Sequence, residues 1–254
     1  MAPDLSSLLL RAQEAAHLAG AELRPRTVDW LAVDSDAGHD VKLAADRRSE
    51  AILAQVLAAT GLPIFSEEAG WIDGGADAAD FWLIDPLDGT ANYSCGVPLC
   101  CVSIGLMRGG RPCAGVIYDF NRDEMFVGAS RQGASLNGAP IRVSAKASRQ
   151  VAILSTGLPV RADYSDQAMA AFARDIPHWK KVRMVGSAAL SLAYVACGRF
   201  DAYREQAIML WDVAAGWALV EAAGGVVRAD VPDLGRPIDV FASNAALAAA
   251  HGRA

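Results

Sequence analysis

The sequence predicts a mixed α/β (α+β) fold in which helices pack on sheets, with mainly antiparallel strands in the first half of the chain. Apolar residues recur at helical spacing in residues 4–24, 188–197 and 213–223. Residues 81–143 instead hold short apolar runs separated by turn residues, a pattern typical of antiparallel strands. A chain of 254 residues that is 53% hydrophobic is long enough to bury the core that such a fold requires.

The predicted helices combine apolar positions at helical spacing with recognisable start and stop residues. They cover residues 4–24, about 46–60, 167–174, 188–197, 213–223 and 245–251. We expect Asp4, Ser187 and Asp212 to be N-caps, because a short polar side chain at that position can accept hydrogen bonds from first-turn amides.

The predicted strands are short apolar runs bounded by turn residues. They cover residues 63–66, 81–84, 99–107, 113–118, 125–129, 135–143, 151–155, 181–184, 201–205, 226–227 and 239–242. Asn137 and Gly138 are expected to form a hairpin turn, and residues 70–80 an exposed connection. Neither an internal repeat nor a low-complexity linker separates the halves. Residues 1–254 are therefore predicted to form one domain with two lobes, roughly 1–145 and 146–254.

Charge and hydropathy argue against several classes of protein. The net charge of −6 and the lack of any Lys/Arg run argue against a nucleic-acid binder. The first twenty residues lack the basic start and the unbroken apolar core of a signal peptide. The longest nearly apolar stretch, residues 213–227, is interrupted by Glu221 and is short for a membrane span. We therefore expect a cytoplasmic protein with no nucleic-acid or membrane partner.

The five cysteines indicate neither a disulfide framework nor a zinc site. Their number is odd, none forms a CxxC pair, and the chain has only four histidines. They lie mostly in apolar surroundings, so we expect buried free thiols in a reducing cytoplasm.

The most informative stretch is residues 81–92, where an apolar run meets two aspartates. Pro86 fixes its own φ and favours an extended Asp85, and Gly89 permits a sharp turn. Asp85 and Asp88 are therefore expected to leave one rigid corner together. Two close carboxylates repel each other unless they share a proton or a hard metal ion lies between them. The alternative is an ordinary Asp-Gly turn after a strand.

Three further acids stand where a predicted element begins or ends. Glu67 follows the strand at 63–66, Asp212 opens the helix at 213–223, and Asp46 lies near a helix start. In α/β proteins, functional groups are often found at such positions. Taken by itself, Asp46 is better explained as an acid that caps its helix or complements the helix dipole.

Together these residues have the composition of a magnesium site. Two Mg²⁺ ions about 3.5–4 Å apart need several carboxylate oxygens and open positions for water and phosphate. The Leu87 carbonyl and the carboxylates of Glu67, Asp85, Asp88 and Asp212 would suffice. Free N–H groups at the helix starts after Thr90 and at Asp212 could bind a phosphate without lysine.

Haloacid dehalogenase-like phosphatases are a competing interpretation, because they also place aspartates after an apolar strand. In their Asp-x-Asp signature the period of a strand puts both acids on one side. Here Pro86 and Leu87 separate the two aspartates, so this chain needs a turn at that point. The spacing therefore disfavours that family.

The chain resembles the inositol monophosphatase family in three motifs that occur in order. They are Ser-Glu-Glu at 66–68, Asp-Pro-Leu-Asp-Gly-Thr-Ala-Asn-Tyr at 85–93, and Trp-Asp-Val-Ala-Ala-Gly at 211–216 with Ala-Gly-Gly at 223–225. Residues 155–159, 186–190 and 198–201 are also similar to family segments, so the resemblance covers nearly the whole chain. It implies a layered αβαβα sandwich of the inositol monophosphatase/fructose-1,6-bisphosphatase type. The activity it implies is Mg²⁺-dependent hydrolysis of a phosphate monoester by metal-activated water.

The resemblance also assigns the metal ligands. By it, Glu67, Asp85 and the Leu87 carbonyl hold one Mg²⁺, and Asp85, Asp88 and Asp212 hold a second. Two or three ions are expected in all. Glu67 is counted among the catalytic residues as well.

Catalytic and substrate-binding roles follow from the same resemblance. Asp46 and Thr90 would orient and deprotonate the attacking water, with no phosphoenzyme, and the N–H groups of Gly89 and Thr90 would hold phosphate oxygens. The substrate-binding residues would further include Asp88, Ser187, Ala188 and Glu205. Glu205 would accept a hydrogen bond from a polyol hydroxyl, and its alternative explanation is a solvated strand end next to Arg204.

At three positions the chain departs from the family pattern. Leu43 stands where many members have Thr, and Ser191 where a close relative usually has Asp. No lysine precedes Lys42, although many members have one there. His39 and Lys42 are the nearest replacements, and neither is predicted to take that role. These departures affect substrate selection rather than the metal ligands.

The leading prediction is therefore a phosphoric monoester hydrolase similar to inositol-1-phosphatase, acting on a small polyol or sugar phosphate, and a homodimer by resemblance. An alternative is a relative that hydrolyses adenosine 3′,5′-bisphosphate, histidinol phosphate or fructose 1,6-bisphosphate. An alternative of a different class is a non-catalytic regulatory protein, for instance an RNA-polymerase partner, that has kept the fold for interaction.

Overall fold

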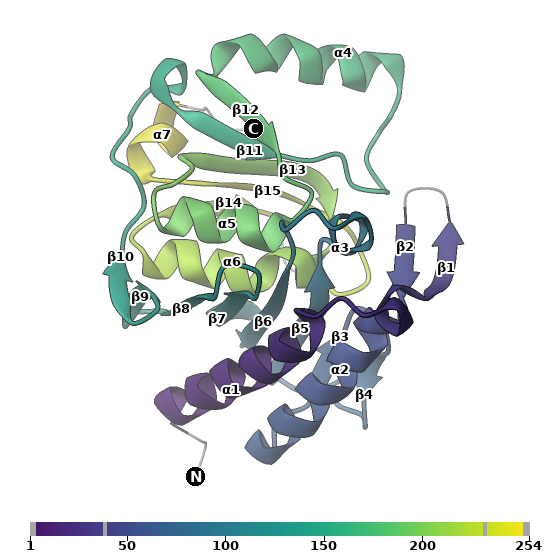
Figure 1. Ribbon diagram of the computed structural model, residues 1–254. Helices are drawn as coiled ribbons and strands as arrows, with labels where there is room; N and C mark the ends of the chain where they lie inside the picture. The colour runs from purple at the N-terminus through teal and green to yellow at the C-terminus, as the bar shows by residue number, and fades with distance from the viewer. Residues whose placement is uncertain (1–3, 38–39, 231–232, 251–254) are drawn as a thin grey trace.

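Helices and sheets alternate in layers through the molecule (Figure 1). The computed structural model describes residues 4–37, 40–230 and 233–250. Its α-helices are α1 (Leu5–Leu23), α2 (Ala44–Leu57), α3 (Thr90–Cys95), α4 (Asp166–Asp175), α5 (Ala188–Ala196), α6 (Leu210–Ala222) and α7 (Ala245–Ala250). Helices α1 and α2 cover the outer face of a large sheet, α5 and α6 lie between the two main sheets, and α4 and α7 lie beyond the smaller one. The layered mixed α/β fold predicted from the sequence is confirmed.

The large sheet has eight strands in the order β10-β9-β8-β7-β6-β5-β3-β4. They are β3 (Ile64–Ser66), β4 (Gly70–Ile72), β5 (Asp80–Asp88), β6 (Cys101–Arg108), β7 (Arg111–Asp119), β8 (Glu124–Ala129), β9 (Gly133–Leu136) and β10 (Ala139–Ile141). All neighbours are antiparallel except β3 and β5, which are parallel. Asn137 and Gly138 form the predicted turn between β9 and β10, with φ angles of 48° and 80°.

The smaller sheet has five strands in the order β12-β11-β13-β15-β14. They are β11 (Ile153–Thr156), β12 (Lys181–Met184), β13 (Ala202–Ile208), β14 (Val226–Ala229) and β15 (Ile238–Ser243). Strand β11 is parallel to both of its neighbours, and the remaining pairs are antiparallel. The other described elements are β1 (Val33–Ala37) and β2 (Asp40–Leu43), which form a two-stranded ribbon, and the 3₁₀ turns at Val28–Leu31, Ala58–Thr60, Arg149–Val151 and Ile176–His178.

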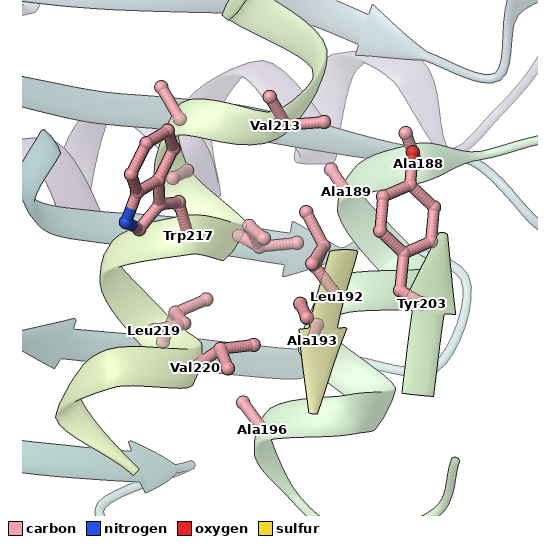
Figure 2. Packing of buried hydrophobic residues seen from close by; sticks show 14 of the residues in the cluster. Ala188, Ala189, Leu192, Ala193, Ala196, Tyr203, Val213, Trp217, Leu219 and Val220 are labelled. Atoms are coloured by element: carbon pink, nitrogen blue, oxygen red, sulfur yellow. The ribbon is translucent and has the colours of Figure 1, made fainter. Parts of the chain in front are cut away.

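Helices α5 and α6 form the centre of the core and lie side by side (Figure 2). Leu192 of α5 faces α6, where Gly216 has no side chain; a Cβ at Gly216 would overlap the Leu192 side chain. The same cluster contains Phe126 of β8 and Tyr203 of β13, so it joins the two sheets through the helices. Buried apolar residues from both halves of the sequence therefore meet in this cluster, and a second cluster lies between the large sheet and α1–α2.

Strand β5 is longer than predicted and includes both aspartates of the central motif. The sequence predicts a strand over residues 81–84, whereas β5 runs from Asp80 to Asp88. Its register against β6 is irregular between Asp85 and Asp88, around Pro86, which has no N–H for the ladder. Asp85 and Asp88 thus belong to a buried strand end, not to an exposed turn.

The predicted N-caps have different outcomes. Ser187 is the N-cap of α5, and its hydroxyl accepts the Leu190 N–H at 3.2 Å. Asp4 occupies the N-cap position of α1 without a side-chain capping bond. The prediction for Asp212 is wrong, because α6 starts at Leu210 with Met209 as N-cap. Asp212 lies within the first turn, and its Oδ2 accepts the Met209 N–H at 3.2 Å.

The sequence predicts that residues 70–80 are an exposed connection. In the structure they begin with strand β4, so this prediction holds only for the part that follows β4. Trp71 of β4 packs edge-on against Phe65 and Phe81, with ring centroids 5.3 Å and 5.0 Å apart. This aromatic contact explains why the chain pairs with β3 there. All five cysteines are free, as predicted, but only Cys100 and Cys101 are buried, and Cys95 is exposed. In the part of the chain that the structure describes, no helix is both long and apolar enough to cross a membrane.

Candidate active site

Three of the predicted acids meet at the ends of three different elements. Glu67 follows β3, Asp85 lies near the end of β5, and Asp212 lies in the first turn of α6. One oxygen from each carboxylate lies within 4.8 Å of the others, and this is the one group of potential metal ligands among the described residues. The folded chain therefore gathers side chains that are far apart in sequence into one acidic cluster.

Burial and mutual repulsion make this cluster unfavourable while it carries only negative charge. Burial raises the pKa of Asp85 well above its usual range, and the charges of Glu67, Asp88 and Asp212 raise it further. Burial likewise raises the pKa of Asp212, with Glu67 and Asp88 as the next causes. A proton or a cation would relieve this repulsion.

Asp88 is held beside the cluster by donors from the start of α5. Its Oδ2 accepts the Ser187 hydroxyl at 2.5 Å and the Ala189 N–H at 2.8 Å. Burial raises the pKa of Asp88, and these hydrogen bonds act in the opposite direction because they favour the carboxylate. Asp88 is not among the three residues whose oxygens lie within 4.8 Å of one another, although its charge acts on Asp85 and Asp212.

Asp46 and Thr90 form a hydrogen bond next to the cluster. The Thr90 hydroxyl lies 3.0 Å from Asp46 Oδ1 and 3.0 Å from the Leu87 carbonyl oxygen. Asp46 Oδ2 accepts the Leu43 N–H at 2.7 Å across the first turn of α2, so Asp46 also acts as the helix-start acid considered above. Burial raises the pKa of Asp46 to about 7, although both hydrogen bonds lower it.

Gly89 makes the sharp turn that the sequence predicts. Its φ is 90°, and a Cβ there would lie 2.8 Å from the Leu99 carbonyl oxygen and 3.2 Å from that of Gly186. Asn92 fastens the following helix, because its Nδ2 donates to the carbonyl oxygens of Leu99 and Val185 at 2.8 and 2.9 Å. A residue with a side chain at position 89 would displace the segment that carries Thr90.

Glu205 is buried and is not the solvated strand end considered as its alternative. Only 8% of its surface is exposed, and the Tyr203 hydroxyl donates to its Oε2 at 2.9 Å. Burial raises the pKa of Glu205 to about 7, while the hydrogen bond from Tyr203 acts to lower it. Its carboxylate lies against Gly157, where a Cβ would come within 2.5 Å of Oε1.

A cavity of about 480 Å³ connects these groups. Glu67, Asp88 and Asp212 line it on the acidic side, and Ser187, Ala188 and Glu205 are also in its wall. Three of the predicted metal ligands and three further predicted substrate-binding residues therefore face one space, whereas Asp85, Leu87, Gly89 and Thr90 are not in its wall. Its volume is within the range of small-molecule sites.

Sequence reasoning missed several residues that shape this site. Tyr203 and Glu205 have strand spacing and face the same side of β13, which the period of two could have indicated. Cys101 lies opposite Asp88 in the strand register, with Sγ 3.7 Å from Asp88 Oδ2. The role of Gly157 depends on Glu205, which is 48 residues away, and no local signal reveals it.

The departures from the family pattern have a partial structural explanation. Ser191 donates to the Ser187 carbonyl oxygen at 2.7 Å and accepts from Ser155 at 2.9 Å, so its hydroxyl is satisfied within the protein. The Leu43 side chain is buried in the core between the large sheet and α1–α2. His39 and the side chain of Lys42 lie outside the described residues.

Comparison with known proteins agrees with this geometry. A sequence model of the inositol monophosphatase family matches residues 4–251. The chain belongs to the inositol monophosphatase family. Its relatives within this family carry two kinds of name. An inositol-1-monophosphatase of Synechocystis sp. is 40% identical over 231 residues, which cover 89% of this chain and 80% of the relative. Nus factor SuhB of Pseudomonas aeruginosa is 38% identical over 233 residues, which cover 89% and 85%.

Solved structures show the same family fold. The inositol monophosphatase from Anabaena (Nostoc) sp. superposes with a TM-score of 0.82 at 38% identity, covering 96% of this chain and 93% of that one. The extragenic suppressor protein SuhB from Bartonella henselae gives a TM-score of 0.84 at 32% identity, covering 95% of each chain. The layered arrangement that brings Glu67, Asp85 and Asp212 together is thus the fold of the inositol monophosphatase family.

Proposed function

We propose that the chain is a Mg²⁺-dependent phosphomonoesterase that hydrolyses a small polyol or sugar phosphate such as inositol 1-phosphate. The observation that carries this proposal is the cluster of Glu67, Asp85 and Asp212 oxygens within 4.8 Å, two of whose residues, Glu67 and Asp212, line a cavity. The donors are all oxygens, which suits a hard cation such as Mg²⁺ better than a soft metal. Membership of the inositol monophosphatase family supports the same metal and reaction.

The proposed ligands fit this cation in charge as well as in chemistry. Glu67, Asp85 and the Leu87 carbonyl would hold one ion, and Asp85, Asp88 and Asp212 a second. Burial raises the pKa values of these aspartates, and bound cations would relieve that cost by supplying positive charge. When bound, Mg²⁺ offsets the charge of the phosphate and lowers the pKa of water, so that hydroxide is available near neutral pH.

Asp46 and Thr90 would handle the proton of the attacking water. Thr90 has one hydroxyl proton, so at any moment it donates either to Asp46 or to the Leu87 carbonyl. As water attacks phosphorus, its proton would pass to the Asp46 carboxylate through or beside the Thr90 hydroxyl. The bond from phosphorus to the ester oxygen then breaks, and the leaving oxygen takes a proton from solvent. A general base with a pKa near 7 suits this transfer at neutral pH.

The remaining residues would position the substrate. The N–H groups of Gly89 and Thr90 would hold phosphate oxygens, while Ser187 and Ala188 form the wall on the α5 side. Glu205 would accept a hydrogen bond from a hydroxyl of the leaving group, because its carboxylate lies in the cavity wall.

Phosphate release from inositol 1-phosphate, with and without Mg²⁺, tests the proposal. We expect Mg²⁺-dependent turnover, and a loss of at least about 100-fold in kcat for Asp88→Asn and Asp85→Asn. Glu22→Gln, on the exposed face of α1, is a control that removes a carboxylate far from the cluster in sequence and should keep full activity. Adenosine 3′,5′-bisphosphate, histidinol phosphate and fructose 1,6-bisphosphate in the same panel would identify a different family substrate.

A second candidate is a non-catalytic regulatory role, which is favoured by relatives named Nus factor SuhB. Under that role, Asp88→Asn would leave the biological function intact, and no ester in the panel would release phosphate in the presence of Mg²⁺. We also propose a homodimer, by analogy with the family, and sedimentation of the purified protein would test it.

A further inference from the structure

Arg161 is the one cationic side chain among the described residues that line the candidate active-site cavity. It lies in the loop between β11 and α4, outside the segments that carry the acidic cluster. Glu67, Asp88, Glu205 and Asp212 all line the same cavity and are negative when ionised. Arg161 is therefore the exception among the ionisable side chains of this cavity, because the other four are acids. The proposed mechanism gives Arg161 no role.

A second cavity of about 580 Å³ begins where the first one ends. Arg161, Glu205 and Ala207 line both cavities, together with residues 156–159. Glu67, Asp88 and Asp212 line only the first cavity, and Met169 and Phe172 of α4 line only the second. Arg161 therefore stands at the junction, on the side away from the acidic cluster.

Nothing among the described residues neutralises Arg161, because it has neither an ion pair nor a hydrogen bond there. The other arginine of the second cavity differs in this respect. Arg204 pairs with Asp175 at 2.9 Å, and Asp175 also accepts from Arg149 at 3.0 Å. The guanidinium of Arg161 thus keeps its donors available for a bound group.

The carboxylates of the second cavity have partners within the protein. Asp239 accepts the Ala207 N–H at 3.0 Å and the Gln206 amide at 3.2 Å. Glu205 accepts from Tyr203, and Asp163 accepts the Ser165 N–H at 2.9 Å. Of the charged side chains at this junction, Arg161 is the one that has neither a hydrogen bond nor an ion pair among the described residues.

The size of the space is the second argument. Ligand sites for whole drug-sized molecules measure roughly 300–1,000 Å³. The first cavity alone is large enough for a phosphate and one polyol ring at Glu205. A leaving group that carried a further substituent past Glu205 would bring that substituent to Arg161 and the second cavity.

We propose that Arg161 binds a second anionic group, a phosphate or a carboxylate, on the leaving group of the substrate. The preferred substrates are then phosphate monoesters that carry two anionic groups separated by a short polyol or sugar. This inference rests on the proposed phosphatase function and specifies its substrate class. Guanidinium suits the role because its planar donors match both phosphate and carboxylate oxygens.

The test compares four proteins on three esters in the presence of Mg²⁺. The proteins are the wild type, Arg161→Gln, Arg161→Lys and Arg174→Gln, which removes an exposed arginine of α4 that lines neither cavity. The esters are inositol 1-phosphate with one anionic group, fructose 1,6-bisphosphate with a second phosphate, and 6-phosphogluconate with a carboxylate. Comparing the last two identifies which anion the site prefers.

We expect Arg161→Gln to lower kcat/KM for at least one of the two doubly anionic esters by about 10- to 100-fold, mainly through KM. Inositol 1-phosphate should change less than about twofold, since it has no second anion. Arg161→Lys should recover part of the loss, because it keeps the charge but not the fork of donors. Arg174→Gln should match the wild type on all three esters.

Calorimetric binding of fructose 6-phosphate, which keeps the second phosphate after hydrolysis at position 1, gives a readout that does not depend on turnover. Arg161→Gln should weaken this binding by a similar factor, and it should leave the affinity for free inositol unchanged. If no ester is hydrolysed by any of the proteins, the proposed function fails, but fructose 6-phosphate binding still decides whether Arg161 recognises an anion.

Three results would overturn the inference. An equal loss on all three esters would mean that Arg161 binds the phosphate being hydrolysed. Unchanged kinetics and unchanged binding in Arg161→Gln would mean that its guanidinium does not reach the ligand. In the wider ester panel described under the proposed function, a preference for histidinol phosphate, whose leaving group is cationic, would mean that the carboxylates of the second cavity select the substrate.

Discussion

The Ala207 N–H donates to Asp239 Oδ1 at 3.0 Å, and Ala207 has a φ of 56°. This left-handed conformation costs a residue with a Cβ about 1–2 kcal/mol. It coincides with the register irregularity of β13 between Glu205 and Ile208, just before the turn that leads to Asp212. The hydrogen bond from Ala207 to Asp239 of β15 therefore holds this strained residue in place. Ala207 lies in the chain between Glu205, a proposed substrate-binding residue, and Asp212, a proposed metal ligand.

Ala207→Gly should raise the free energy of unfolding by about 0.5–1 kcal/mol, because glycine adopts a positive φ without strain but costs more entropy on folding. Urea unfolding measures this change. Ala202→Gly, in the same strand at an ordinary φ, is the matched control and should destabilise by about 1 kcal/mol or more. Equal destabilisation by both changes would contradict the assignment of strain to position 207.

Asp239→Ala should destabilise the protein by about 1–2 kcal/mol, because the Ala207 N–H loses its acceptor at the strained position. The loss should be smaller when Ala207→Gly is already present, since that backbone needs less support. A double-mutant cycle by urea unfolding measures the coupling. Strictly additive effects would show that Asp239 does not support this conformation.

Gly157→Ala should disturb the Glu205 carboxylate, because the new Cβ would lie 2.5 Å from Oε1. We expect a rise in KM of about 10-fold for a polyol phosphate, with a smaller effect on kcat. The control is Gly157→Ala in a Glu205→Ala background, where no carboxylate remains to be displaced. A further rise in KM in that background would show that position 157 acts on the substrate by another route.

Removing Mg²⁺ should destabilise the wild-type protein, because a ligand that binds only the folded state stabilises it by about 2.7 kcal/mol at 100 times its Kd. Asp85→Asn should be more stable than the wild type without Mg²⁺, since it removes a buried charge beside Glu67 and Asp212. It should also lose most of the Mg²⁺-dependent rise in Tm. If Mg²⁺ raised the Tm of Asp85→Asn by as much as it raises the Tm of the control Glu22→Gln, Asp85 would be excluded as a ligand.

Stability without Mg²⁺ should fall as the pH rises from about 4.5 to 7, in part through Glu205. Its pKa is raised from 4.5 to about 7 in the folded protein, so in this window the folded state holds a proton that the unfolded chain releases. The contribution of Glu205 to the free energy of unfolding is fully present below pH 4.5 and is lost above pH 7. Its upper limit is about 3 kcal/mol.

Glu205→Gln should flatten this part of the pH dependence of unfolding in urea. Glu14→Gln, on the exposed face of α1, is the control and should keep the wild-type slope. An unchanged slope in Glu205→Gln would mean that Glu205 titrates normally in the folded protein.

Much of the fold follows from local sequence signals. Strand β12 has the predicted bounds, Ser187 is the N-cap of α5, and the hairpin lies at Asn137 and Gly138. These features depend on side chains that act on their own or neighbouring backbone, so nearby residues determine them. The predictions for β5 and Asp212 were wrong by a few residues, because pairing with β6 and the first-turn bond to Met209 override the local signals.

For the site, the sequence by itself determined which residue types stand at the ends of elements: Glu67, Asp85, Asp88 and Asp212, with Gly89 at the turn. The tertiary structure alone decided that Glu67, Asp85 and Asp212 meet within 4.8 Å, and that Gly157 and Tyr203 shape the surroundings of Glu205. The physical reason is that such contacts join residues from different strands and helices. Their distances depend on how the layers pack, which local sequence patterns do not specify.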